Sequence, residues 1–133
     1  MSAPTVLVVD DEPLARWSVA ETLSDCGYRV TAVDDAAAAL RAMAGPGEPP
    51  RVVLLDLWLP DRNDLEVLSA MQQLSPSTKI ILITAYGTEA LFEDARRRGA
   101  FAVLDKPVEM SALAPLVASA LATQAEPQAP SLY

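Results

Sequence analysis

The stretch VLVVDD at residues 6–11 joins a short apolar run to two carboxylates, and the same arrangement recurs along the chain. Three further runs each stop on a polar residue: VVLL (52–55) before Asp56, IILI (80–83) before Thr84, and AVL (102–104) before Asp105-Lys106-Pro107. Short runs rich in Val, Ile and Leu and bounded by turn residues are typical of strands buried on both faces of a parallel sheet. These runs therefore predict the centre of such a sheet.

Helix-like stretches separate the apolar runs, and a weaker strand is expected at residues 29–33, so that strand and helix alternate five times. This alternation is typical of successive right-handed βαβ units and predicts an α/β protein. Pro13 suits the first turn of a helix, and Asp34 or Asp35 can cap the second helix. The expected strands are 5–9, 29–33, 51–55, 79–83 and 100–104, and the later helices are 65–74, 88–98 and 111–121.

Length and composition limit the function classes. The 133 residues fit one domain, residues 1–122, followed by a linker stub or disordered tail at 123–133, and 51% hydrophobic content excludes wholesale disorder. The net charge of -8 argues against a nucleic-acid-binding surface and suits a divalent cation. Without histidine and with one cysteine, Cys26, the chain lacks zinc ligands. The start has no basic region or membrane-length apolar run, which favours a cytoplasmic protein with no membrane contact.

The polar residues that follow the strands predict a shared site. Strands of a parallel sheet point the same way, so residues past their carboxyl ends gather at one edge, where open α/β sheets bind ligands. Crowded carboxylates repel one another unless a cation lies among them, and oxygen ligands suit Mg²⁺ or Mn²⁺. An ammonium and a hydroxyl beside them could hold a transferred phosphoryl group, with Asp56 as the nucleophile. The residues concerned are Asp10, Asp11, Asp56, Thr84 and Lys106.

Each of these residues also has a simpler interpretation. An Asp pair after a strand is often a turn or a helix cap, Thr84 can be a cap, and Lys-Pro is a common dipeptide. A purely structural reading, however, requires four independent coincidences at one edge of one sheet. The functional reading is therefore preferred.

In their order and sequence, the motifs VLVVDDEP, LLDLWLPD, ILITAYG and GAFAVLDKP resemble the receiver domain of two-component response regulators, of the CheY-like superfamily. The resemblance covers nearly all of residues 5–121. It implies a doubly wound, flavodoxin-like sheet of five parallel strands in the order 2-1-3-4-5, with helices on both faces. EPLARWSV and ITAYGTEA resemble more narrowly the receivers of NtrC-like transcriptional activators.

The same resemblance implies roles for the site residues. Asp56 would accept phosphate from a histidine kinase, and Asp10 and Asp11 would hold Mg²⁺ together with Asp56 and the main-chain carbonyl of Trp58. Thr84 and Lys106 would contact the phosphoryl group, and Lys106-Pro107 would be a cis peptide. Such a protein is a signalling domain that catalyses only its own phosphotransfer and dephosphorylation, not an enzyme in the ordinary sense.

Two departures from the family pattern concern the output surface. Val103 lies where a switching aromatic is common, and Val108 lies where an aromatic often follows Lys-Pro. Because side chains alternate along a strand, we expect Phe101 to share the face of Val103, and we hypothesise that Phe101 or Tyr86 reports the state of Thr84. Receivers often pair through the fourth helix, fifth strand and fifth helix. Here Arg96-Arg97-Arg98 could meet Asp105 and Glu109 in such a homodimer.

Other interpretations remain open at this point. A degenerate receiver could bind a partner without phosphate, although the intact acidic, Lys and Thr positions argue against it. A Mg²⁺-dependent phosphohydrolase with an aspartyl nucleophile resembles Asp-x-Asp at the first strand, whereas Asp10 and Asp11 are adjacent. A nucleotide or flavin carrier would need a phosphate loop where Asp10-Asp11-Glu12 stands. Cys26, Met43 and Met71 are expected in the core, and Trp17 is expected to be half-buried or in contact with a partner.

Overall fold

A computed structural model describes residues 4–57, 59, 61, 65–85 and 87–123. Within these residues the ten predicted elements are present, and their ends differ from the predicted ones by at most two residues. The strands are β1 (Thr5–Val9), β2 (Arg29–Val33), β3 (Val52–Asp56), β4 (Lys79–Thr84) and β5 (Ala100–Asp105). The helices are α1 (Pro13–Asp25), α2 (Ala36–Ala44), α3 (Glu66–Leu74), α4 (Glu89–Arg97) and α5 (Met110–Thr123).

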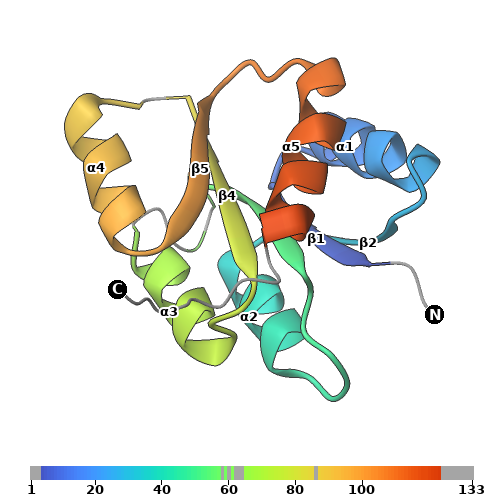
Figure 1. Cartoon of the computed structure of the whole chain (residues 1–133), viewed down its shortest axis with the longest axis horizontal. Helices are drawn as coiled ribbons and strands as arrows, with labels where there is room; N and C mark the ends of the chain where they lie inside the picture. Colours follow the sequence, from blue (N-terminus) through green and yellow to red (C-terminus); the bar gives the residue numbers. More distant parts are fainter. Residues whose placement is uncertain (1–3, 58, 60, 62–64, 86, 124–133) are drawn as a thin grey trace.

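The five strands form one parallel sheet in the order β2-β1-β3-β4-β5, as predicted (Figure 1). Every residue of β3 is buried, and so is every residue of β4 after its first. Strands covered on both faces need apolar side chains on both, which explains why these segments are continuously hydrophobic. β2 lies at the edge of the sheet and is largely exposed or half-buried, which accounts for its weaker apolar pattern.

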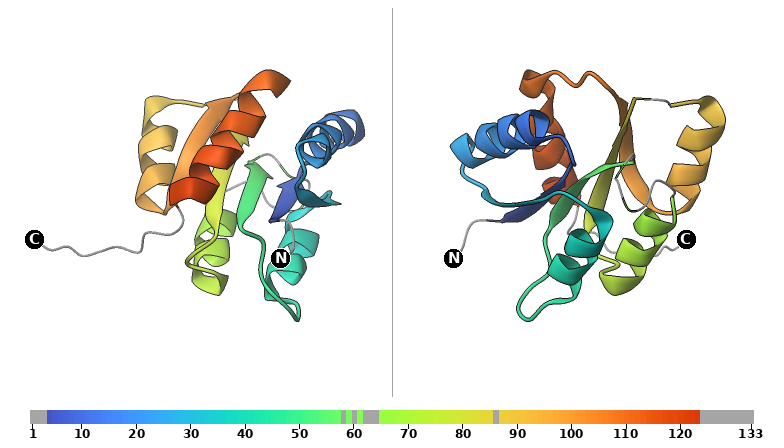
Figure 2. Two further views of the ribbon diagram at one scale, coloured as in Figure 1. Left: turned by 45° about the vertical axis from the view of Figure 1, so that its right-hand side comes forward. Right: turned by 180° about the vertical axis from the view of Figure 1, so that it is seen from behind.

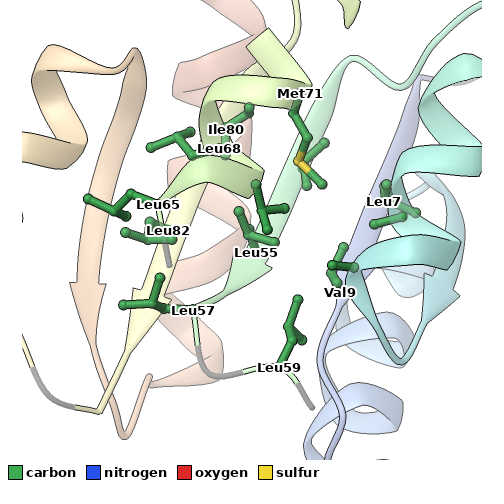
Figure 3. Close-up of a cluster of buried hydrophobic side chains, with 14 of the residues drawn as sticks. Leu7, Val9, Leu55, Leu57, Leu59, Leu65, Leu68, Met71, Ile80 and Leu82 are labelled. Carbon is green, nitrogen blue, oxygen red and sulfur yellow. The ribbon is translucent and has the colours of Figure 1, made fainter. Parts of the chain in front are cut away.

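Two hydrophobic cores lie on opposite faces of the sheet. Side chains that alternate along β1 divide between them, since Leu7 and Val9 pack with α2, α3 and α4 while Val6 and Val8 pack with α1 and α5. Figure 2 shows α1 and α5 together on one side of the sheet and α2 and α3 on the other. Figure 3 shows the first core, in which Met71 of α3 meets leucines of the central strands. The fold is the doubly wound α/β arrangement that the sequence predicts.

Local signals explain several helix ends. Pro13 occupies the first turn of α1. Asp35, one of the two predicted caps, accepts a hydrogen bond from the backbone N–H of Ala38 (2.8 Å), and Thr88 caps α4 through the N–H of Leu91 (3.1 Å). None of the helices in the described ranges is long and apolar enough to cross a membrane.

Two expectations about side-chain burial are corrected. Cys26 is exposed, because α1 ends at Asp25 and Cys26 is the residue that caps it, beyond the buried stripe of Val19 and Leu23. Trp17 is 61% exposed and not half-buried, because it lies off that stripe, while the alternative that it contacts a partner stays a prediction. Met43 and Met71 are buried, as predicted.

The expectation that Phe101 shares a face with Val103 is wrong. The pairing of β4 with β5 shifts by one residue, since Ile80 is opposite Ala100 but Ile81 is opposite Ala102. The extra residue is a β-bulge, which interrupts the alternation of side chains. Phe101 therefore packs with the α1 and α5 core, whereas Val103 packs with the opposite core. Phe101 is on the wrong face to replace an aromatic at 103, and Tyr86, the other candidate, lies outside the described residues.

Candidate functional site

Three aspartates meet at the carboxyl edge of the sheet. Asp10 and Asp11 follow β1 and Asp56 ends β3, and the parallel register that pairs Val9 with Leu55 brings the two strand ends together. One carboxylate oxygen of each aspartate lies within 4.8 Å of the other two. Asp10 and Asp56 are buried, whereas Asp11 is exposed. The predicted carboxylate cluster is therefore present.

The turn after β1 is fixed by contacts to Asp10. Its Oδ1 accepts a hydrogen bond from the backbone N–H of Glu12 (3.0 Å), and its carbonyl oxygen accepts one from Nη1 of Arg16 (2.9 Å). Its own N–H donates to the carbonyl of Val33 in β2 (3.1 Å). These contacts hold the Asp10 carboxylate at the strand end while Pro13 starts α1 immediately afterwards.

Lys106 supplies a cation to the cluster. Its Nζ donates a hydrogen bond to Oδ2 of Asp56 (3.1 Å) and lies 3.9 Å from Oδ2 of Asp10. Partial burial of the ammonium lowers the pKa of Lys106, but the hydrogen bond to Asp56 and the charges of Asp56, Asp10 and Asp11 outweigh this and raise the pKa overall. Lys106 is consequently held in its charged form. The peptide bond to Pro107 is cis, as the family resemblance implies.

Thr84 lies on the strand next to Asp56. It ends β4, it is fully buried, and its carbonyl oxygen accepts a hydrogen bond from the backbone N–H of Lys106 (2.8 Å). The register of β3 and β4 pairs Asp56 with Ile83, one residue before Thr84. Each predicted site residue thus lies at the same edge of the sheet, except Trp58, which falls outside the described residues.

The chemistry of the cluster fits a hard divalent cation. Carboxylate oxygens this close together repel one another, and a small ion that prefers oxygen ligands relieves that repulsion. A cavity of about 400 Å³ lies beside the cluster. Its polar lining comes from Asp10, Glu12 and Lys106, and apolar residues of α1, β4, the β5–α5 loop and α5 complete it. The site therefore combines acidic ligands, a fixed ammonium and space for a small group.

Comparison with known proteins identifies the family. The response regulator receiver domain family matches residues 6–118. The chain belongs to this family. Receiver domains are signalling modules, generally not classed as enzymes, that bind Mg²⁺ at an acidic pocket and interact with histidine kinases.

Individual relatives are transcriptional regulators, and NtrC proteins are among them. The transcriptional regulator NtrC of Azospirillum brasilense is 32% identical over 97% of this chain, and the regulator FixJ of Bradyrhizobium diazoefficiens is 34% identical over 95% of it. The chain spans 26% of the length of that NtrC and 60% of the length of FixJ.

Solved structures give the same result for the fold. A CheY-like receiver from Methanospirillum hungatei is 28% identical, with a TM-score of 0.87 over 92% of this chain and 97% of the other. The receiver domain of NtrX from Brucella abortus is 34% identical, with a TM-score of 0.79 over 89% of this chain and 98% of the other.

Two contacts of this receiver domain were not predicted from the sequence. Arg16 binds the Asp10 carbonyl from the first turns of α1. Asp61, in the loop after β3, accepts hydrogen bonds from two backbone N–H groups of α2 that lie about two dozen residues earlier. The Asp61 contact leaves no signal in a local pattern, because it joins segments that are far apart in the sequence, and the Arg16 contact spans six residues that no motif marks.

We expect Asp11→Asn to weaken the response of this domain to Mg²⁺. In wild type, Mg²⁺ at a hundredfold excess over its Kd would stabilise the fold by about 2.7 kcal/mol. The variant loses one of three charged ligands, so its melting temperature should rise in EDTA, where the carboxylates repel, and respond less to Mg²⁺. Differential scanning fluorimetry with and without Mg²⁺ measures both effects. Asp25→Asn, the same charge change at the end of α1, should respond like wild type, and an equal response from Asp11→Asn would remove Asp11 from the ligand set.

Proposed function

We propose that this receiver domain is a phosphoacceptor that takes a phosphoryl group from a histidine kinase onto Asp56 with the help of Mg²⁺. The observation that supports this best is the 3.1 Å contact of Lys106 Nζ with Oδ2 of the buried Asp56, inside a cluster of three carboxylates. A fixed ammonium beside a buried nucleophile provides electrostatic stabilisation where phosphoryl charge develops.

The chain's own residues divide the work of the transfer. A carboxylate oxygen of Asp56 attacks the phosphorus, a new O–P bond forms, and the N–P bond to the donor imidazole breaks, so that the imidazole leaves. Lys106 pairs with the phosphoryl oxygens after they arrive, and the Thr84 hydroxyl donates a hydrogen bond to one of them. The product is an aspartyl phosphate.

The proposed metal site consists of Asp10, Asp11, Asp56 and the main-chain carbonyl of Trp58, the last of which lies outside the described residues. A bound Mg²⁺, or Mn²⁺ in its place, would neutralise the carboxylates and the incoming phosphoryl oxygens. Asp10 is held for this role by the N–H of Glu12, which occupies its Oδ1.

Two rival functions fit the site less well. A phosphate-independent receiver has no need of the Lys106–Asp56 pair or of the carboxylate cluster, yet both are present. A phosphohydrolase with an aspartyl nucleophile on the first strand is disfavoured because Asp10 and Asp11 are adjacent and the carboxylate that Lys106 contacts most closely is on β3.

The proposal is tested with a small phosphodonor and Mg²⁺. We expect intact-mass analysis to detect one added phosphoryl group per chain, dependent on Mg²⁺ and removed by hydroxylamine, which cleaves acyl phosphates. Beryllofluoride should perturb amide NMR signals around Asp56 and Thr84. Absence of both responses in the folded protein would favour the phosphate-independent function.

The response surface and the domain limits complete the proposal. Phosphorylation would switch the surface of α4, β5 and α5, where a two-fold dimer could form. In the described protomer Asp94 pairs with Arg97 (3.1 Å) and Arg98 (3.3 Å), so a dimer that used these two arginines would exchange or extend these contacts. Sedimentation with and without beryllofluoride tests whether this dimer forms on activation.

α5 extends to Thr123, and the proposed boundary between the receiver domain and the tail, between residues 122 and 123, lies at the end of this helix.

A further inference from the structure

The first turn of α2 is held by two carboxylates from different parts of the chain. Asp35 precedes the helix and accepts from the N–H of Ala38 (2.8 Å), as an ordinary N-cap residue does. Asp61 lies in the loop between β3 and α3, and its Oδ1 and Oδ2 accept from the N–H groups of Ala36 (2.9 Å) and Ala37 (3.0 Å). The first three backbone donors of α2 therefore all bind carboxylates.

The contact of Asp61 joins two loops that flank the acidic site. α2 follows β2, and the last residue of β2, Val33, accepts the backbone N–H of Asp10. The β3–α3 loop begins directly after Asp56. Asp61 thus connects the β3–α3 loop, which follows Asp56, to the start of α2, which follows the strand beside Asp10.

The rest of the described loop is anchored in the core. Leu57, Leu59 and Leu65 are buried in the cluster shown in Figure 3. The N–H of Leu57 donates to the carbonyl of Ile83 in β4 (3.1 Å). Asp61 is the exposed member of this series and is fixed by hydrogen bonds instead of burial.

A helix cap alone does not account for the arrangement. The N–H of Ala37 lies at an exposed position and can bind water, and Asp35 already caps α2, so within the helix it is chiefly the partly buried N–H of Ala36 that needs the second carboxylate. The loop gains more, because two charge-assisted hydrogen bonds, reinforced by the helix dipole, fix one of its residues in space. Only four residues separate Asp56 from Asp61 in the sequence, so fixing residue 61 restricts the positions open to Leu57 and Leu59, the described residues between them.

We propose that Asp61 is a positioning residue for phosphorylation: by fastening the β3–α3 loop to the first turn of α2, it holds Leu57 and Leu59 in place beside Asp56. This inference rests on the proposed function of Asp56. It requires no contact between Asp61 and the phosphoryl group.

The test compares Asp61→Ala with Asp35→Ala. Both variants remove a carboxylate from the start of α2, but only the first releases the loop. We expect phosphorylation by a small phosphodonor at saturating Mg²⁺ to slow about tenfold in Asp61→Ala and to stay near the wild-type rate in Asp35→Ala. Asp61→Asn retains one acceptor oxygen and should lie between them.

Amide hydrogen exchange provides a readout that is independent of phosphorylation. Exchange at Leu59, whose N–H donates to the carbonyl of Leu57 (3.1 Å), should accelerate about tenfold in Asp61→Ala and stay unchanged in Asp35→Ala. The first amides of α2 should exchange faster in both variants. Equal rates and equal loop exchange in the two variants would overturn the positioning role, and Asp61→Asn decides the matter if Asp61→Ala does not fold. If wild type does not accept phosphate, the proposed function of Asp56 is wrong. Hydrogen exchange at Leu59 would then still show whether the contact of Asp61 with α2 holds the loop.

Discussion

Asp56→Asn should abolish phosphoryl uptake while the protein stays folded. The amide nitrogen and oxygen that replace the carboxylate are far weaker nucleophiles, so no stable O–P bond forms at this position. The shape of the side chain is kept, and the weakened contact with Lys106 is offset by the removal of one of three mutually repelling carboxylates, so the protein should stay folded. We expect intact-mass analysis to find the added phosphoryl group in wild type and none in the variant under the same conditions.

Two further variants make this assignment specific. Asp61→Asn changes a carboxylate in the next loop and should slow uptake without preventing it. Asp105→Asn, beside Lys106 but exposed, should take up phosphate like wild type. Equal phosphate content in Asp56→Asn and wild type would move the phosphoacceptor to another residue.

The carboxyl edge of the sheet could be predicted because each of its residues follows an apolar run. Buried parallel strands have a strong sequence signal, and parallel strands force the residues after Val9, Leu55 and Ile83 to one edge. The resulting cluster of Asp10, Asp11 and Asp56 depends on strand direction and order alone. The position of Lys106 at this edge followed from the same argument, whereas its hydrogen bond with Asp56 was not predicted.

Features that depend on one-residue shifts or on distant loops could not be predicted. Because of the bulge between β4 and β5, Phe101 lies on the α1 and α5 face of the sheet, whereas strict alternation would put it on the same face as Val103. Nothing in the sequence AFAVLD marks the extra residue. Cys26 was expected to be buried but is exposed, because α1 ends at Asp25, one residue earlier than predicted. Asp61 contacts α2 across the fold, a pairing that no local pattern in the chain encodes.

Replacing Lys106 by Met should destabilise the metal-free domain. Met keeps most of the aliphatic stem but removes the ammonium that hydrogen-bonds the buried Asp56 carboxylate, and a hydrogen bond to a charged group contributes about 1.5 to 3 kcal/mol. Urea unfolding in EDTA measures the loss. Lys79→Met, at the opposite end of β4 and the other lysine of the chain, should show a smaller change.

The cause is isolated by a double-mutant cycle. Asp56→Asn/Lys106→Met removes both charges of the pair, so most of the loss caused by Lys106→Met should be recovered. Mg²⁺ should also recover part of it, because a bound cation would replace the ammonium among the carboxylates. Additive effects of the two substitutions would mean that the pair contributes nothing to the stability of the fold.

The pH dependence of the same variant follows from the raised pKa of Lys106. Burial opposes the charge, but the hydrogen bond to Asp56 and the neighbouring carboxylates hold the folded pKa above its ordinary value of about 10.5. A cation with a raised folded pKa stabilises the fold fully below its unfolded pKa, and this stabilisation disappears as the pH rises through the folded pKa. The difference in unfolding free energy between wild type and Lys106→Met should therefore be constant near neutral pH and shrink above about pH 10.5. Groups that titrate alike in both proteins cancel in this difference, so a difference that stays constant or grows at high pH would show that Lys106 is not stabilised by the carboxylates.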